Sequence, residues 1–237
     1  MIIFCFLTYN DIIPIQRWNT FFKNIDSSKY KVMIHPKTSI IKNKYQFPVL
    51  SVQNKIHTIN KSHISIVKAT LQLLKESYEL INHDEKNHFI FCSQNCIPLY
   101  DFIFYENFLK NCKKSILSCI DGNKKERYVK LDQYVKQFIT QKQFVKQQPN
   151  MILTDIDVKK LINADFTNYF RYLECPDEHY FINVLLYLLK SNIIKSQTHF
   201  CNFDIHKTQA MEFNNINQSL LNQIKKMGFL FMRKVSH

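Results

Sequence analysis

Residues 2–22, with the sequence IIFCFLTYNDIIPIQRWNTFF, decide the fold. Residues 2–7 form a continuous apolar run, which is typical of a parallel strand buried on both faces. The apolar residues that follow have the three- and four-residue spacing of one helix face, and they are Ile15, Trp18, Phe21 and Phe22. The next expected strand lies at residues 30–35 and is ended by Pro36. Together these segments predict a β-α-β unit.

The rest of the chain continues the alternation of strands and helices. The clearest helix carries an apolar stripe with steps of three and four residues, made of Ile64, Val67, Leu71, Leu74, Tyr78 and Ile81. The same kind of pattern predicts strands at 47–52, 88–92, 115–120, 151–153 and 229–235, and helices at 101–109, 155–162, 181–188 and 216–224. Alternating strands and helices predict an α/β fold with a mainly parallel sheet flanked by helices.

The chain is expected to form a single domain over residues 1–237. Its hydrophobic content of 46% is enough for one large core. The strongest turn signal is Asp121-Gly122-Asn123. A polar segment rich in lysine and glutamine follows at 124–149. It is predicted to be a flap or excursion rather than a linker between domains.

Composition excludes several classes of function. The chain has only 2 glycines and contains neither G-x-G-x-x-G nor G-x-x-x-x-G-K-[ST], so a glycine-rich phosphate loop is excluded. The G-x-S-x-G elbow of serine hydrolases is also missing. The net charge of +13 suggests a polyanionic partner. Yet arginine, which reads bases and clamps phosphates, is rare, and AT-rich coding explains the lysine bias better. No specific nucleic-acid partner is expected.

The cysteines indicate free thiols in a reducing compartment such as the cytosol. There are 7 cysteines and no C-x-x-C pair. Cys92 and Cys96 are close in sequence, but no histidine pair follows them at zinc-finger spacing. A zinc site is therefore disfavoured. No apolar stretch approaches the length of a membrane span, so no membrane-spanning segment is expected.

The most distinctive cluster of ionisable residues is Asp177-Glu178-His179, directly before a predicted helix. An acidic side chain in a first helical turn is stabilised by the helix dipole, and a carboxylate at the mouth of a sheet suits a general base. Asp177 is well placed to cap the helix. The alternative is that both acids only cap and counter the dipole, and the local pattern alone favours it.

Two further motifs have a functional and a structural interpretation. Arg233 and Lys234 end a predicted strand, where paired cations suit a diphosphate, although a solvated tail would look the same. The segment Thr154-Asp155-Ile156-Asp157 contains the D-x-D of manganese-dependent sugar transferases. It also fits a capping box that begins at Thr154, and capping is the favoured role.

In order along the chain, these segments resemble the core-2/I-branching β-1,6-N-acetylglucosaminyltransferase family, including its plant-type members. The blocks that carry the resemblance cover almost the whole sequence. They are residues 2–22, 30–36 (YKVMIHP), 65–74 (SIVKATLQLL), 88–100 (HFIFCSQNCIPLY), Arg127-Tyr128, 151–154, Asp177-Glu178-His179 and 229–235 (FLFMRKV).

The resemblance implies a GT-A-like, Rossmann-type fold and a UDP-sugar transferase that inverts the anomeric carbon without a metal or other cofactor. The favoured sugar is N-acetylglucosamine, transferred to a hydroxyl of a glycan or glycoprotein. By the same resemblance Glu178 is the catalytic base, with Asp177 and His179 shaping its site.

The resemblance also implies roles for residues outside this motif. Lys234, helped by Arg233, would neutralise the diphosphate in place of a metal. Thr8 lies where the nucleotide base is expected. Arg127 and Glu126 fall in the segment that faces the acceptor.

The sequence departs from the family pattern in two places. Lys61-Ser62 replaces a Trp-Gly, and residues 147–150 (QQPN) replace a Gly-Ser-Gln-Trp near the expected sugar pocket. The second change keeps an alternative open, a degenerate module that binds a glycan or nucleotide without turnover. A basic nucleic-acid-binding protein, suggested only by the charge, is the least favoured hypothesis.

Overall fold

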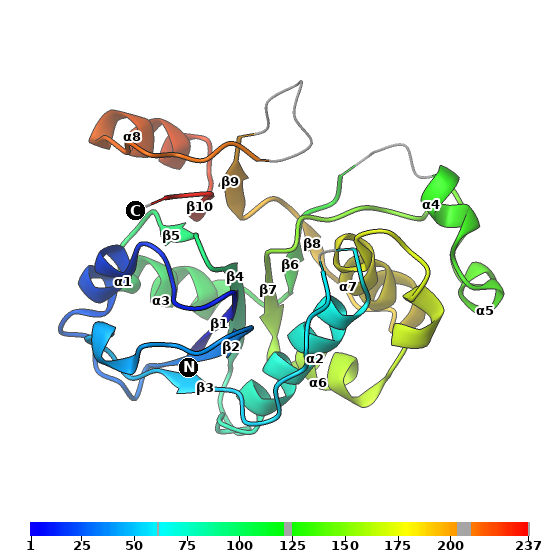
Figure 1. The fold of residues 1–237 in the computed structure, drawn as a ribbon, viewed down its shortest axis with the longest axis horizontal. Helices are drawn as coiled ribbons and strands as arrows, with labels where there is room; N and C mark the ends of the chain where they lie inside the picture. The colour runs from blue at the N-terminus through cyan, green and yellow to red at the C-terminus, as the bar shows by residue number, and fades with distance from the viewer. Residues whose placement is uncertain (61, 121–124, 203–209, 237) are drawn as a thin grey trace.

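The computed structural model describes residues 1–60, 62–120, 125–202 and 210–236. Its main feature is a seven-stranded sheet with the order β3-β2-β1-β4-β7-β6-β8 (Figure 1). The strands are β1 (Ile2–Thr8), β2 (Tyr30–Pro36), β3 (Leu50–Ser51), β4 (His88–Ser93), β6 (Ile116–Leu117), β7 (Met151–Thr154) and β8 (Ile194–Lys195). Only β7 runs antiparallel to its neighbours. The predicted mainly parallel sheet is confirmed.

The central strand β1 is apolar throughout because both of its faces are covered. Ile3 and Cys5 belong to the apolar cluster on one face of the sheet. Phe4 and Phe6 belong to the cluster on the other face. Successive side chains of a strand point to opposite faces, so a continuous apolar run is needed to fill two cores at once.

Helices cover the sheet on both sides (Figure 1). On one side lie α1 (Ile15–Phe22) and α3 (Phe102–Asn111), where Phe4 packs edge-to-face on Trp18 with 5.7 Å between ring centroids. The other side carries α2 (Ser65–Tyr78), α6 (Asp155–Asn163), α7 (Tyr180–Asn183) and the π-helical turn η4 (Val184–Leu188). This arrangement confirms the predicted α/β fold with flanking helices.

A second sheet of three short strands connects distant parts of the chain. It has the order β5 (Ile97–Pro98), β10 (Phe231–Arg233), β9 (His199–Cys201). Strand β10 pairs antiparallel with β5 and parallel with β9, and α8 (Gln218–Lys226) precedes it. The predicted strand at 229–235 is thus real but shorter, and it lies outside the main sheet.

The short elements were the least predictable. The strands predicted at 47–52 and 115–120 contain only the two-residue strands β3 and β6. Nothing in the sequence pattern predicted β5, β8, β9, α4 (Lys125–Val129) or α5 (Gln133–Lys136). Single turns of 3-10 helix, η1 (Lys42–Lys44), η2 (Thr167–Phe170) and η3 (Pro176–Glu178), complete the described elements. The turn signal at 121–123 lies outside the described residues.

The segment predicted as a flap is anchored to the protein core. Of its described residues, Leu131, Val135, Ile139 and Phe144 are buried and belong to the apolar cluster that contains α2 and α7. Whether part of the segment closes over a ligand stays a prediction. In the part of the chain that the structure describes, no helix has the length and apolar character needed to cross a membrane.

Candidate active site

A cavity of about 280 Å³ contains predicted site residues from distant parts of the sequence. Asp177, Glu178 and Arg233 line it together. Its walls also include Leu7 near the end of β1 and Ser93 at the end of β4. The carboxyl ends of parallel strands are the usual ligand-binding edge of such a sheet. This cavity is therefore the candidate active site.

A tight turn presents the acidic pair to the cavity. Cys175 has a left-handed backbone with φ 48° and ψ 60°, and the 3-10 turn η3 follows it directly. Within this turn the amide of Glu178 donates to the carbonyl of Cys175 at 3.0 Å. The predicted helix does follow, as α7. The predicted capping by Asp177 is wrong, because the N-cap position of α7 is His179 and no side chain caps this helix.

Glu178 is fixed by two cations that contact the same carboxylate oxygen. Its Oε2 lies 3.0 Å from the guanidinium of Arg127 and 3.0 Å from the ammonium of Lys146. Among the described residues, Oε1 makes no hydrogen bond or ion pair. The side chain keeps 24% of its accessible surface. One oxygen is thus used to hold the carboxylate, and the other can accept a proton.

His179 supports this arrangement from behind. Its ring stacks on Phe144 with 4.7 Å between centroids. Nδ1 lies 3.0 Å from the carbonyl oxygen of Val145, and Nε2 lies 2.9 Å from the guanidinium of Arg127. Burial lowers the pKa of His179 to about 4. The neutral ring therefore donates from Nδ1 and accepts from Arg127 at Nε2, which orients Arg127 toward Glu178.

Asp177 differs from its neighbour in environment. Its residue is partly exposed, but its Oδ1 atom is buried and has no hydrogen-bond partner among the described residues. Burial raises the pKa of Asp177 to about 7, and the nearby Glu178 contributes in the same direction. Neighbouring carboxyl groups with different environments are typical of acid–base sites.

The segment that departs from the family pattern, residues 147–150, borders the cavity. Pro149 is one of the lining residues. Asn150 accepts a hydrogen bond of 2.9 Å from Arg233 through its Oδ1. The backbone amide of Gln147 donates to the carbonyl of Glu178 at 2.7 Å. This segment therefore holds both the acidic turn and the cationic strand end in place.

The remaining predicted residues lie around the cavity. Lys234 follows Arg233 but does not line the cavity among the described residues. Glu126 is exposed in α4. Thr8 ends β1, and its hydroxyl donates to the carbonyl of Asn10 at 2.6 Å. Their roles stay predictions.

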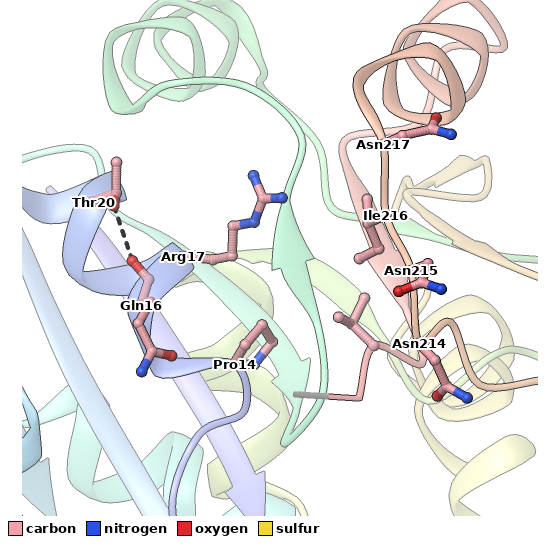
Figure 2. Close-up of a pocket in the computed structure, with 9 residues that line it drawn as sticks. Pro14, Gln16, Arg17, Thr20, Asn214, Asn215, Ile216 and Asn217 are labelled. Carbon is pink, nitrogen blue, oxygen red and sulfur yellow. Dashed lines mark hydrogen bonds between the residues drawn. The ribbon is translucent and has the colours of Figure 1, made fainter.

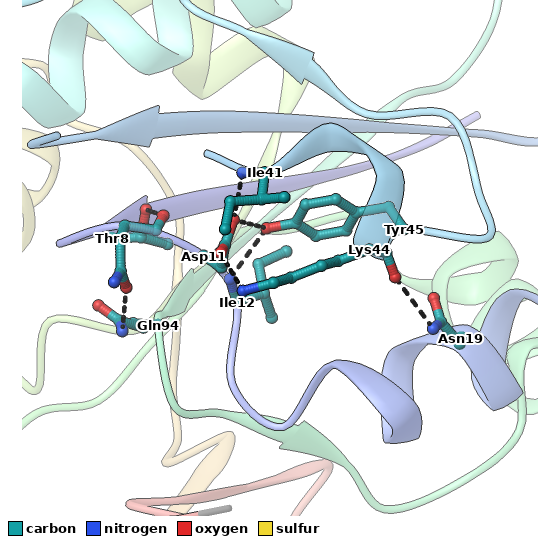
Figure 3. Close-up of polar contacts among 9 residues, drawn as sticks. Thr8, Asp11, Ile12, Asn19, Ile41, Lys44, Tyr45 and Gln94 are labelled. Carbon is teal, nitrogen blue, oxygen red and sulfur yellow. Dashed lines mark hydrogen bonds and ion pairs between the residues drawn. The ribbon is translucent and has the colours of Figure 1, made fainter. Parts of the chain in front are cut away.

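The loop after Thr8 is held by a buried carboxylate. Asp11 accepts from the amide of Ile41 at 2.8 Å and from the hydroxyl of Tyr45 at 3.2 Å. The ammonium of Lys44 lies 3.1 Å from its second oxygen. Figure 3 shows these side chains converging beside the end of β1. Nothing in the sequence pattern predicted this support.

Comparison with known proteins identifies the family. The family described as Core-2/I-Branching enzyme matches residues 2–227 of the chain. The protein belongs to the core-2/I-branching enzyme family. It is therefore a glycosyltransferase, and the expected resemblance is confirmed. Among curated proteins, none matches the sequence.

Two solved structures resemble this family member distantly. A galactosyltransferase, LgtC, in complex with donor and acceptor sugar analogues is 13% identical, with 84% of this chain and 75% of that chain covered and a TM-score of 0.46. TarS of S. aureus is 7% identical, with 68% and 29% covered and a TM-score of 0.35.

The D-x-D segment at Thr154-Asp155-Ile156-Asp157 has a structural role in this family member. The Thr154 hydroxyl accepts from the amide of Asp157 at 3.3 Å, so the predicted N-cap is confirmed. Asp157 is buried and accepts from Ser115 at 2.5 Å. The Asp157 carboxylate is therefore buried and already hydrogen-bonded within the fold.

Two residues that hold the site in this family member had no signal in the sequence. Lys146 looked like one more lysine in a lysine-rich segment, and Asn150 belonged to a segment noted only for its departure from the family.

A larger cavity of about 640 Å³ lies away from these residues. Figure 2 shows Arg17 of α1 on one wall of it, with Asn214, Asn215 and Asn217 on the other. None of the predicted site residues lines it.

Proposed function

We propose that this glycosyltransferase moves N-acetylglucosamine from a UDP-sugar to a hydroxyl of a glycan, inverts the anomeric carbon, and needs no metal for the transfer. The observation that carries the proposal is the cavity shared by Asp177, Glu178 and Arg233. It combines a candidate base with a candidate cation for the leaving group.

Glu178 is the proposed base. Arg127 and Lys146 hold Oε2, so Oε1 is the atom expected to take the proton of the acceptor hydroxyl. The acceptor oxygen then attacks the anomeric carbon from the face opposite the departing UDP. The new bond forms as the carbon–diphosphate bond breaks, and the configuration inverts. Positioned bases of this kind contribute about 10²–10⁴-fold to rates.

Arg233 and Lys234 are the proposed partners of the diphosphate. A fixed cation beside the leaving group stabilises the negative charge that grows in the transition state. Arg233 is well positioned for this because Asn150 holds one arm of its guanidinium. Its Nε is buried and has no hydrogen-bond partner among the described residues.

Thr8 and the segment of Arg127 and Glu126 complete the proposal. Thr8 marks the place for the nucleotide base, beside the loop that Asp11 holds. Arg127 and Glu126 lie on α4, which would face the acceptor. Arg127 would then serve two purposes, since it also fixes the base.

Glu178→Gln tests the base. The variant keeps the shape of the side chain and loses its basicity, so the turnover rate is expected to fall by about 10²-fold or more with donor affinity retained. Glu174→Gln is the matched control, because Glu174 is exposed on the same turn and pairs only with the surface Lys130 among the described residues. Full activity in Glu178→Gln would disprove the assignment.

The donor and the metal requirement are tested by thermal stability against a panel of nucleotide sugars. In buffer freed of Mn²⁺ and Mg²⁺, one UDP-sugar should raise the melting temperature. The shift should be lost in Lys234→Ala and kept in the exposed control Lys159→Ala. Adding Mn²⁺ should change neither binding nor turnover. A strict need for Mn²⁺ would contradict metal-independent transfer.

The degenerate module is the second candidate, because residues 147–150 border the cavity and differ from the family. It predicts donor binding without turnover over a broad panel of acceptors. Where turnover occurs, the proton coupling of the anomeric centre in the product shows whether the configuration was inverted.

A further inference from the structure

A cluster of two cysteines and one histidine lies behind the candidate active site. Cys92 lies in β4 directly before its last residue, Cys96 follows in the next turn, and His199 begins β9. The two sulfurs and one ring nitrogen all lie within 4.8 Å of one another. All three residues are buried, with 0%, 0% and 1% of their surface exposed. The pairing of β9 with β10 brings the histidine to the cysteines across 107 residues of sequence.

His199 is oriented as a metal-binding histidine would be. Its Nδ1 lies 2.9 Å from the hydroxyl of Thr198, and its ring stacks on Phe231 with 4.5 Å between centroids. The other nitrogen, Nε2, lies 3.8 Å from the sulfur of Cys92. Metal-bound histidines usually donate from the second ring nitrogen to a protein acceptor, which fixes the tautomer.

The spacing fits a small thiophilic ion. Zinc binds sulfur at about 2.3 Å and imidazole nitrogen at about 2.0–2.1 Å, so ligand atoms on one zinc ion lie roughly 3.5–3.8 Å apart. The distance of 3.8 Å between Sγ of Cys92 and Nε2 of His199 is already close to this ligand–ligand spacing. We propose that Cys92, Cys96 and His199 form a structural site for a thiophilic metal ion, Zn²⁺ or Cu⁺.

The charges of such a site balance inside the protein. Binding releases one proton from each thiol to solvent, and no electron is transferred. Two thiolates and a neutral imidazole then leave a Zn²⁺ site uncharged, and a Cu⁺ site with one negative charge. The surroundings suit thiolates, since the hydroxyl of Ser93 and the amide of Asn150 lie 3.1 Å and 3.6 Å from the sulfur of Cys96. Three protein ligands leave a fourth position for a small ligand on zinc.

The site would link the small sheet to the active cavity. Ser93 and Arg233 both line the cavity, and Asn150 contacts Cys96 and Arg233 with its two polar atoms. A metal ion would therefore clamp the turn after β4 to β9 and keep Asn150 and Arg233 in position. It touches no residue of the acidic turn, so its role is structural and separate from the proposed metal-independent transfer.

Metal content and cobalt spectroscopy test the site. Wild-type protein purified with reductant, stripped of metal and refilled with Zn²⁺ alone or Cu⁺ alone should retain one ion per chain by elemental analysis. Refilling with Co²⁺ alone should give thiolate-to-cobalt absorption, and added Zn²⁺ should abolish it. The ion found in freshly purified protein distinguishes zinc from copper. Removal of the ion should lower the melting temperature.

Variants locate the ligands. Cys96→Ser and His199→Asn should lose the ion and the cobalt spectrum, and circular dichroism reports whether each still folds. Cys5→Ser is the matched control, because Cys5 is equally buried but lies against Ser77 at 3.5 Å. Retention of the ion in the folded His199→Asn variant would overturn the proposal. Wild type that binds no ion on refilling, or that contains a Cys92–Cys96 disulfide instead, would overturn it without any variant.

Discussion

Arg127 donates a hydrogen bond of 3.0 Å to Oε2 of Glu178 across 51 residues of sequence. The same guanidinium lies 2.9 Å from the ring nitrogen of His179. One side chain thus connects helix α4 to the acidic turn. Its position explains how a carboxylate in a short 3-10 turn keeps a single orientation.

Loss of Arg127 should therefore misorient the base. We expect Arg127→Ala to lower the turnover rate by about 10–100-fold, with a smaller loss in Arg127→Lys because one contact can be kept. Arg171→Ala is the control, since Arg171 is exposed and contacts the ring of Tyr172 at 4.7 Å. Steady-state kinetics measures both. Equal rates in wild type and Arg127→Ala would show that Lys146 alone holds Glu178.

The pKa of Asp177, raised to about 7 by burial, predicts an effect on stability. Between about pH 4 and 7 the unfolded Asp177 is ionised while the folded one keeps its proton. Folding then takes up a proton, so this residue makes the wild type less stable as pH rises through that window. Asp177→Asn removes the effect.

The difference in unfolding free energy between Asp177→Asn and wild type should therefore grow by on the order of 3 kcal/mol from pH 4 to pH 7, and level off above pH 7. Urea titrations at a series of pH values measure it. Asp84→Asn, at an exposed site, is the matched control. A constant difference for Asp177→Asn would contradict the shifted pKa.

The lowered pKa of His179 predicts that the protein loses stability as pH falls. Burial lowers the pKa of His179 to about 4, so between about pH 6.5 and 4 the unfolded histidine is protonated while the folded one is neutral. Its contribution to stability is present above pH 6.5 and is lost as pH falls through that window. The difference in unfolding free energy between wild type and His179→Gln should shrink by on the order of 2 kcal/mol as pH falls from 6.5 to 4. His57→Gln, at an exposed site, is the matched control.

Asn150 is expected to act through Arg233. Removal of its Oδ1 in Asn150→Ala frees the guanidinium that the hydrogen bond of 2.9 Å now positions. Donor affinity should fall by about 10-fold or more, since a hydrogen bond to a charged group contributes about 1.5–3 kcal/mol, with a smaller change in turnover. Isothermal titration with the UDP-sugar measures this, and Asn111→Ala at the exposed end of α3 is the control. An unchanged affinity would mean that Arg233 needs no support.

Sequence patterns predicted the parts of the fold that are set by local periodicity. The strand at β1 and the helices α1 and α2 follow from continuous apolar runs or three- and four-residue spacing. Strands β5 and β9 have two and three residues, too few for a period to be visible. Their pairing depends on contacts between segments far apart in the sequence.

The same limit applies to the site. Asp177, Glu178 and Arg233 could be named from motifs and from the family resemblance, and the structure places all three at one cavity. Lys146, Asn150 and His199 could not, because each contributes through a tertiary contact and has neighbours of unremarkable type. The cysteine spacing pointed away from a metal because the histidine comes from another strand.

The placement of β10 between β5 and β9 means that the small sheet can form only after the large sheet has been synthesised. A ribosome-bound chain that has not yet extruded residues 231–233 already contains every strand of the large sheet. It lacks the strand that joins the two outer members of the small sheet, and with it Arg233. The nascent enzyme would thus have its proposed base in place while the cation for the leaving group is still missing, and catalytic competence would arrive as the last strand docks.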